Sequence, residues 1–308
     1  MANRPGERVI LIAGPTASGK SAAALTLADA LGAEIINADA LQVYRDLHIL
    51  SARPAPAEEA RAPHRLFGHV DGAVRYSVGG WARDAAAALA AVAARGRPAI
   101  VVGGTGLYFR ALTEGLSAAP DIPAEIRREA EARLAAMGLE AFRAEVLAAD
   151  PAMARLKPAD RHRHLRAWEV WRTAGRPLSE IQKEPGTPIA PLIAARVVIE
   201  PARGDLYRVI ETRFDRMLAA GALEEARALR ARGLDPGLPV MRAVGAAELL
   251  QHLEGRLSLD DAARLAKQSS RRFAKRQLTW LRNQSPDWPR APSPAEAAKQ
   301  LLAELRQP

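Results

Sequence analysis

Eight consecutive residues near the start of the chain have the types and the spacing of a phosphate-binding loop. They match the pattern G-x-x-x-x-G-K-[ST] and are Gly14, Pro15, Thr16, Ala17, Ser18, Gly19, Lys20 and Ser21. In such a loop the backbone N–H groups close around phosphate oxygens, the lysine adds a positive charge, and the serine hydroxyl can coordinate Mg²⁺. An apolar run precedes the loop and a helical pattern follows it, as this motif requires. The chain is therefore predicted to bind a phosphorylated ligand, whose identity the loop alone leaves open.

Two further polar turns follow apolar runs that are typical of buried strands. The run at residues 34–38 ends at Asp39, and the run at residues 99–102 ends at a glycine-rich turn that contains Thr105. In a parallel sheet with right-handed crossovers, ligands bind at the carboxyl ends of the strands, so both turns are expected beside the phosphate loop. Asp39 could act there as a general base, a magnesium ligand or a helix N-cap. Two glycines stand where a phosphate-loop ATPase usually has an acidic magnesium ligand, which argues against an ordinary NTPase.

The order of the elements predicts an α/β fold, with a P-loop NTPase-like parallel sheet, helices on both faces and an inserted all-helical domain. Strands are expected at residues 8–13, 34–38, 99–102 and 195–199, and residues 51–71 are expected to form a long loop. The strand signal disappears between about residues 120 and 191, where helices are predicted at residues 123–137, 139–149 and 158–174. The core is therefore assigned to residues 1–119 and 192–308. Its helices are expected at residues 77–94, 205–219, 223–231, 240–253, 258–282 and from 293 onward. Ser77, Ser258 and Ser293 are expected to be N-caps.

Composition excludes some classes of protein and suggests a partner. The chain has 44 Lys and Arg residues against 35 Asp and Glu, a net charge of +9, and no cysteine. The missing cysteines rule out disulfides and thiolate zinc sites, and no apolar run approaches bilayer length. Residues 1–6 lack an apolar targeting segment, so a cytoplasmic protein is expected. The positive charge fits either an arginine-rich solvated surface or a polyanionic partner, and it is dense at residues 157–166 and 271–282.

Six stretches of the chain together resemble the bacterial tRNA dimethylallyltransferases, also called tRNA isopentenyltransferases. They are residues 14–21, 37–44, 103–108, 163–169, 241–245 and 274–280. The resemblance implies transfer of a dimethylallyl group from dimethylallyl diphosphate to N6 of adenine-37, the base 3′-adjacent to the anticodon, in tRNAs reading codons that begin with U. It further implies that Asp39 acts as general base, that Thr105 contacts the nucleotide, and that the loop, Mg²⁺ on Ser21 and Arg242 stabilise the leaving diphosphate.

The resemblance also implies a set of contacts to the anticodon arm of tRNA, made by a chain expected to be a monomer. Besides Asp39 and Thr105, the residues implied are Ala40, Leu41, Gln42, Arg127, His162, Arg163, His164, Leu165, Arg166, Leu265, Ala266, Lys267, Gln268, Ser269 and Ser270. The chain departs from the family pattern at Ala40, where serine is usual, and at Ala246, where an aromatic residue is common. These departures bear on fine geometry and rate rather than on the class of reaction.

Two other functions share the same motifs. A small-molecule kinase would use the loop for ATP and Asp39 as base or metal ligand. An RNA-binding module would keep the basic surface and have a vestigial loop. The three functions predict different outcomes. The transferase uses dimethylallyl diphosphate as donor, the kinase transfers phosphate from ATP, and the RNA-binding module binds RNA without forming a product.

Overall fold

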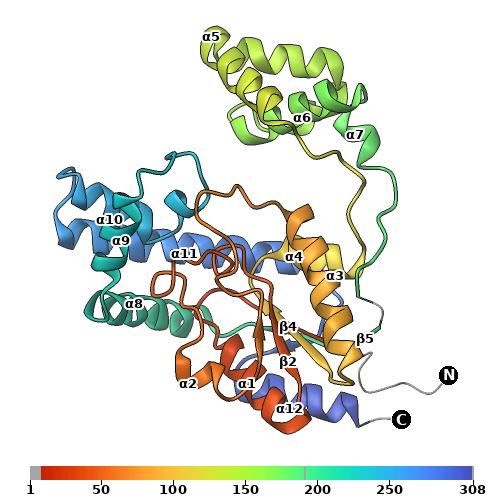
Figure 1. Ribbon diagram of the computed structural model, residues 1–308, viewed down its shortest axis with the longest axis vertical. Helices are drawn as coiled ribbons and strands as arrows, with labels where there is room; N and C mark the ends of the chain where they lie inside the picture. The colour runs from red at the N-terminus through yellow and green to blue at the C-terminus, as the bar shows by residue number, and fades with distance from the viewer. Residues whose placement is uncertain (1–7, 191, 307–308) are drawn as a thin grey trace. The chain divides into compact units, whose positions relative to one another are not determined.

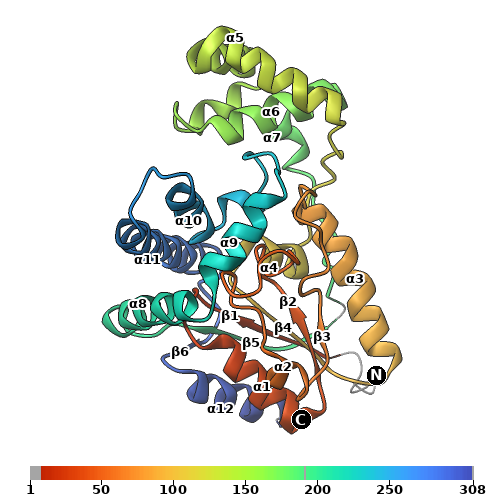
Figure 2. The same cartoon turned by 60° about the vertical axis from the view of Figure 1, so that its left-hand side comes forward.

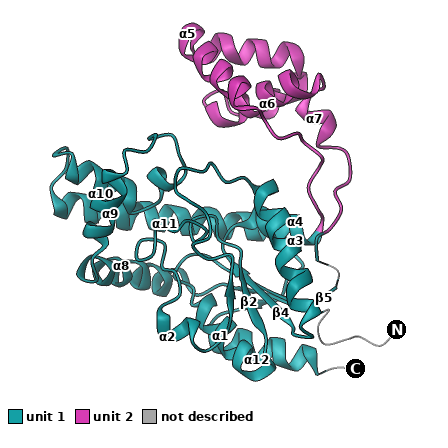
Figure 3. Cartoon of the chain, viewed as in Figure 1, with its two compact units in different colours: residues 1–113, 189–308 teal, residues 114–188 magenta. Residues whose placement is uncertain are grey.

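The computed structural model describes residues 8–190 and 192–306, and the chain divides into two compact units. One comprises residues 1–113 and 189–308, and the other residues 114–188 (Figure 3). The expectation drawn from residues 1–6 and the expected domain end at residue 191 lie outside the described residues. The two units are described separately below.

The larger unit is built on a six-stranded parallel sheet (Figure 1). The strand order is β3-β2-β4-β1-β5-β6, and Figure 2 labels all six strands. The strands are β1 (Val9–Ala13), β2 (Glu34–Asn37), β3 (His64–Arg65), β4 (Ala99–Gly103), β5 (Ile193–Ile199) and β6 (Arg290–Ala291). The predicted parallel α/β sheet is confirmed. The edge strands β3 and β6 were not predicted, because two residues are too few to give a hydrophobic pattern and they are defined only by pairing with a neighbour.

Every residue of β1, β2 and β4 is buried, because helices cover the sheet on both faces. On one face, α1 (Lys20–Leu31) and α12 (Pro294–Leu305) pack in one hydrophobic cluster with alternate strand residues such as Ile10, Ile35 and Ile100. The other face is covered by α3 (Val78–Ala94) and α4 (Gly106–Thr113), as Figure 2 shows. The caps predicted at Ser77 and Ser293 are confirmed, since each hydroxyl accepts a hydrogen bond from an N–H of the first turn.

Four helices of the C-terminal half pack against one another: α8 (Arg203–Ala219), α9 (Ala222–Ala231), α10 (Ala246–Leu253) and α11 (Leu259–Gln284). The prediction of a single helix at residues 240–253 is wrong. A short 3-10 helix, η3 (Val240–Arg242), is separated from α10 by a bend at Gly245, whose φ of 90° disfavours any other residue. A Cβ at Gly245 would also lie 3.0 Å from the Phe214 ring. The expected loop at 51–71 likewise contains α2 (Pro56–Glu59) as well as β3.

The smaller unit is helical and has its own core. It contains α5 (Ala124–Ala149), the 3-10 helix η2 (Pro151–Arg155), α6 (Arg161–Ala174) and α7 (Leu178–Ile181). Gly138 is non-helical and divides α5 into the two predicted segments. Helix α6 starts three residues later than predicted, because Asp160 caps it by accepting a hydrogen bond from the Arg163 N–H at 3.2 Å. Trp168 is buried in this core and its indole N–H donates to Glu145 at 2.9 Å.

A buried carboxylate stabilises the amino end of β2, which is the end opposite to Asp39. The side chain of Glu34 is 1% exposed and accepts hydrogen bonds from Arg95 at 2.7 and 2.9 Å and from Arg65 at 2.8 Å. Burial by itself would raise the pKa of Glu34, but these two guanidinium groups outweigh it and lower the pKa below its ordinary value. Glu34 therefore connects β2 to β3 and to the end of α3.

We expect Glu34→Gln to lower the free energy of unfolding by about 1–3 kcal/mol at pH 7, since it removes charge-assisted hydrogen bonds. A carboxylate whose pKa is lowered by folding stabilises the protein above its unfolded pKa of about 4.3, and this contribution is lost as pH falls through the folded value. The difference in free energy of unfolding between wild type and Glu34→Gln, measured by urea unfolding, should therefore become smaller from pH 7 through pH 5 to pH 3.5. Glu59→Gln, at an exposed position of α2, is the control. A difference that does not depend on pH would contradict the assignment.

Candidate functional site

The phosphate loop connects β1 to α1 and has the form of an anion-binding turn. Ala17 and Gly19 adopt positive φ angles of 66° and 82°, which turn the backbone back on itself before the helix begins. A Cβ at Gly19 would collide with Pro294 at the start of α12, so only glycine fits there. The Ser18 hydroxyl is buried and has no hydrogen-bond partner among the described residues. An unpartnered buried donor in a loop at a helix N-terminus fits a bound phosphate.

Two cations and one anion lie close together at this loop. Lys20 is buried and its amine donates to the carbonyl of Pro15 at 3.3 Å. Arg213 reaches the loop from α8 and donates to the Thr16 hydroxyl at 2.5 Å. Burial lowers the pKa of Lys20 to about 8; Asp39 acts against this shift, and Arg213 adds to it. Burial also lowers the pKa of Arg213, again opposed by Asp39. The site is therefore a desolvated, positively charged pocket with one carboxylate beside it.

The turn after β2 holds Asp39 at the carboxyl edge of the sheet, where it was predicted. Asp39 is half-buried, and its Oδ1 accepts a hydrogen bond from the Leu41 N–H at 3.0 Å. The turn after β4 supports it from the next strand: the Thr105 hydroxyl accepts from the Ala40 N–H at 2.9 Å, and the Thr105 N–H donates to Ala38 at 3.1 Å. Thr105 therefore joins the turns that follow β2 and β4. This structural role is separate from the nucleotide contact that the resemblance implies.

Gln277 of α11 joins the phosphate loop to the same β4 turn. Its oxygen accepts from the Thr16 N–H at 2.8 Å, and its amide nitrogen donates to the Gly104 carbonyl at 3.0 Å. The side chain is buried, and a Cβ at Gly104 would collide with it. One amide thus satisfies two backbone groups that belong to adjacent functional loops.

A cleft opens between these loops and the C-terminal helices, and both polar and apolar side chains line it. Its polar lining residues are Thr16, Asp39, Ser51, Arg213 and Ser270. Its apolar lining residues are Leu41, Leu50, Ile210, Phe214, Met217, Val244 and Phe273. Such a lining fits a ligand that has both an anionic group and a hydrocarbon group.

Comparison with known proteins identifies the family. A family model described as IPP transferase matches residues 42–284, and one described as isopentenyl transferase matches residues 7–73. The chain belongs to the tRNA dimethylallyltransferase family. A tRNA dimethylallyltransferase of Phenylobacterium zucineum is 53% identical over 92% of this chain and 92% of its own. That of Nitrobacter hamburgensis is 52% identical over 95% of this chain and 92% of its own.

Solved structures agree with this assignment. The crystal structure of a tRNA isopentenylpyrophosphate transferase from Bacillus halodurans is 29% identical, with a TM-score of 0.68, and the alignment covers 97% of both chains. A eukaryotic dimethylallyltransferase acting on tRNA is 27% identical, with a TM-score of 0.74 over 89% of this chain and 69% of the other.

The resemblance implies that Arg242 stabilises the diphosphate, but in the structure Arg213 lines the cleft and Arg242 does not. The Arg242 side chain is exposed, donates to the Pro236 carbonyl at 3.2 Å, and does not line the cleft. Arg213 was missed because it lies in no recognised motif. The available signal was its helical spacing: Ile210, Phe214 and Met217 form an apolar stripe on α8, and Arg213 lies within that stripe. A cation inside an apolar stripe indicates a buried charge with a specific partner.

The residues of this dimethylallyltransferase family member expected to contact tRNA differ in their exposure. In the larger unit, Ser270 lines the cleft, whereas Gln42 donates to the carbonyls of Ser51 and Ala52. Lys267 is paired with Asp215 at 2.6 Å. Ala40, Leu41, Leu265, Gln268 and Ser269 are all partly exposed. Ala266 is fully buried, so the expected contact through its side chain is corrected.

In the helical unit the expected contacts on α6 also need correction. His162 and Arg163 are exposed, and Arg127 and Arg166 are half-buried. His164 and Leu165 are buried in the unit's own core, with His164 Nε2 3.3 Å from the Lys157 carbonyl, so their side chains do not face solvent. Burial lowers the pKa of Arg166, and Glu169 opposes the shift.

Neither a membrane span nor a ready-made metal centre occurs in the part of the chain that the structure describes. No helix there is both long and apolar enough to cross a bilayer. No group of three or more histidine or carboxylate side chains could hold a metal among those residues. Ser21 is exposed at the first turn of α1, so its hydroxyl can serve as the single protein ligand of an ion held mainly by phosphate and water.

The pKa of Lys20 leads to a prediction for anion binding. Because the amine loses its charge as pH rises through about 8, we expect the affinity of the wild-type protein for inorganic pyrophosphate to fall between pH 7 and 9 relative to Lys20→Arg. Arginine stays charged over this range, so the ratio of the two dissociation constants cancels the titration of the ligand itself. Isothermal titration calorimetry at pH 7, 8 and 9 measures the ratio. A constant ratio would show that Lys20 stays protonated throughout.

Proposed function

We propose that this protein transfers a dimethylallyl group from dimethylallyl diphosphate to N6 of adenine-37, next to the anticodon of tRNAs that read codons beginning with U, and releases diphosphate. The observation that supports this most is the cleft, which combines a cationic phosphate loop, an apolar wall and one carboxylate. Membership of the tRNA dimethylallyltransferase family supports the same substrates.

The chemistry assigns a task to each part of the cleft. When the allylic C–O bond breaks, negative charge develops on the departing diphosphate, and the loop N–H groups, Lys20 and Arg213 stabilise it. The N6 amine is a weak nucleophile because its lone pair is delocalised into the ring. Asp39 accepts its proton as the new C–N bond forms. Stacked adenine cannot reach a cleft at a sheet edge, so the base is extruded from the anticodon stack first.

Mg²⁺ belongs to this proposal. Bound to the diphosphate, it would neutralise part of the leaving-group charge. The exposed Ser21 hydroxyl fits as its protein ligand, since Mg²⁺ usually retains several waters and takes few protein oxygens. The proposed RNA partner is the anticodon arm of tRNA. The protein itself is proposed to act as a monomer in the cytoplasm. The net charge of +9 and the exposed cations of α6 support binding to a phosphate backbone.

A nucleoside assay tests the function. Purified protein is incubated with unmodified tRNA, Mg²⁺ and either dimethylallyl diphosphate or ATP. The tRNA is then digested to nucleosides, whose masses are measured by mass spectrometry. We expect dimethylallyladenosine with the first donor and no product with ATP. Asp39→Asn should bind tRNA as the wild type does but lower kcat by ~10²–10⁴-fold, because the proton acceptor is lost. Phosphate transfer from ATP would favour a kinase, and no product with either donor would favour an RNA-binding module.

Arg213 and Arg242 make a matched pair for the diphosphate side of the reaction. Arg213→Ala should lower kcat by ~10²–10³-fold, since it removes a half-buried donor beside the leaving group. Arg242→Ala should stay near the wild-type rate, because that guanidinium is exposed and outside the cleft lining. Steady-state rates at saturating tRNA measure both. The opposite order would return the role to Arg242.

A further inference from the structure

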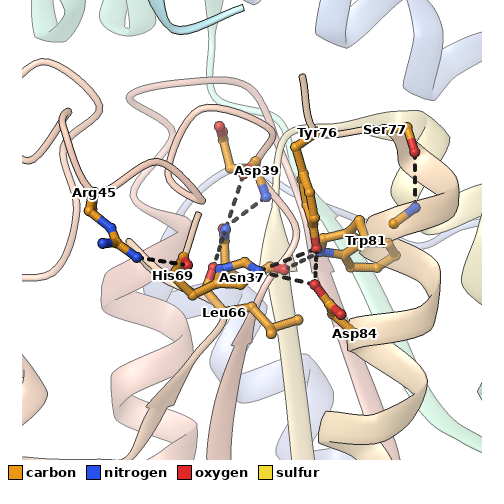
Figure 4. A network of polar contacts seen from close by, with 10 residues as sticks. Asn37, Asp39, Arg45, Leu66, His69, Tyr76, Ser77, Trp81 and Asp84 are labelled. Carbon is orange, nitrogen blue, oxygen red and sulfur yellow. Dashed lines mark hydrogen bonds and ion pairs between the residues drawn. The ribbon is translucent and has the colours of Figure 1, made fainter. Parts of the chain in front are cut away.

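A buried amide at the end of β2 clamps the backbone of the residue proposed as the general base. Asn37 is 0% exposed, and Figure 4 shows its side chain turned toward Asp39. Its Oδ1 accepts from the Asp39 N–H at 2.8 Å, and its Nδ2 donates to the Asp39 carbonyl at 3.0 Å. One side chain thus binds both backbone polar groups of the same residue.

Neighbouring elements hold the amide itself in place. Its Nδ2 also donates to the carbonyl of Leu66 at 3.0 Å, just after the edge strand β3. The backbone carbonyl of Asn37 accepts from the indole N–H of Trp81 at 2.9 Å. Trp81 is completely buried and stacks on Tyr108 of α4, with the ring centroids 4.1 Å apart (Figure 4 labels Trp81). The orientation of Asn37 is therefore set by contacts on three sides.

The hydrogen bonds of the turn form two successive Asx turns. Asn37 accepts from the N–H two residues on, and Asp39 does the same through Oδ1 to the Leu41 N–H at 3.0 Å. The second turn commits one carboxylate oxygen of Asp39. Oδ2 has no hydrogen bond with any other described residue, which leaves it to accept a proton. The direction of Oδ2 follows from the backbone of Asp39, which Asn37 holds.

From this geometry we infer that Asn37 is a positioning residue that aims the free oxygen of Asp39 at the reacting amine. The inference rests on the proposed function. Asn37 does not itself line the cleft and makes no hydrogen bond with the phosphate loop; its contact with the cleft is through Asp39, so we expect it to affect proton removal and not the binding of the diphosphate. A displacement of a catalytic group by about 1 Å can cost ~10²-fold in rate, which makes the position of Asp39 worth a dedicated side chain.

Two substitutions separate positioning from general stability. Asn37→Ala removes the acceptor for the Asp39 N–H and should lower kcat by ~10–100-fold, with the KM for dimethylallyl diphosphate unchanged. Asn37→Ser keeps an oxygen that can accept from the N–H two residues on, so it should restore kcat to within about fivefold of wild type. A role in stability alone predicts no such rescue, because rates corrected for the folded fraction would be equal in both variants.

Glu34→Gln is the matched control at the other end of β2. It also removes buried hydrogen bonds of that strand, and it should lower the unfolding temperature without changing kcat per folded molecule. If Asn37→Ala does not fold, Asn37→Asp takes its place. That variant sets a carboxylate oxygen against the carbonyls of Asp39 and Leu66 and should lower kcat at least about tenfold at neutral pH.

The outcomes are distinguishable. A wild-type protein that makes no dimethylallyladenosine overturns the proposed function. An active wild type with equal kcat in Asn37→Ala, or in Asn37→Asp where alanine is not tolerated, overturns the role of Asn37. A loss in Asn37→Ala that appears in KM rather than kcat, or that serine does not restore, overturns it as well.

Discussion

The pairing of β4 with both β1 and β2 is the constraint on which the rest of the site depends. It places the ends of three strands in one row, with Ala13 opposite Gly103 and Asn37 opposite Val102. The β4 turn then lies in contact with both neighbours. A Cβ at Gly103 would collide with the Ala38 carbonyl, and one at Gly104 would collide with Gln277. The two glycines that stand in place of the acid of an ordinary phosphate-loop ATPase are therefore required by close packing.

The charges of the cleft make sense only with a ligand present. Lys20 and Arg213 are both desolvated, and Asp39 is the carboxylate that acts on both of them. One buried and one half-buried cation near one half-buried anion leave an excess of positive charge, which is costly in a poorly solvated site. A diphosphate would supply the missing negative charge. In the proposed reaction Asp39 accepts a proton, which a tight ion pair with either cation would oppose. Its backbone is held instead by the neutral amide of Asn37, and the N–H of the next residue, Ala40, is held by the Thr105 hydroxyl.

Local sequence patterns were enough to predict much of the fold. Contacts between segments far apart in the chain could not be predicted in this way. The caps at Ser77, Ser258 and Ser293 follow from short-range hydrogen bonding and were predicted. The two-residue strands β3 and β6 and the contact of Arg213 with Thr16 depend on residues far apart in the chain. The five consecutive residues 162–166 show a different limit. Successive residues of a helix point about 100° apart, so a contiguous motif on α6 cannot all face RNA, and His164 and Leu165 are buried as the helix requires.

Helix α11 shows how one element can serve the cleft and the surface together. Ser270, Phe273 and Gln277 lie at helical spacings of three and four, so they share a face; the first two line the cleft and the third holds the phosphate loop. The cations of the run at 271–282 mostly point elsewhere: Arg272, Lys275 and Arg276 are exposed. A helix dense in positive charge would repel itself and the cationic loop if those charges faced inward. The neutral amide of Gln277 avoids this, because it binds the loop through two hydrogen bonds and adds no charge to the pocket. The arrangement lets the outer face of α11 carry positive charge for a polyanion without raising the electrostatic cost of the buried site.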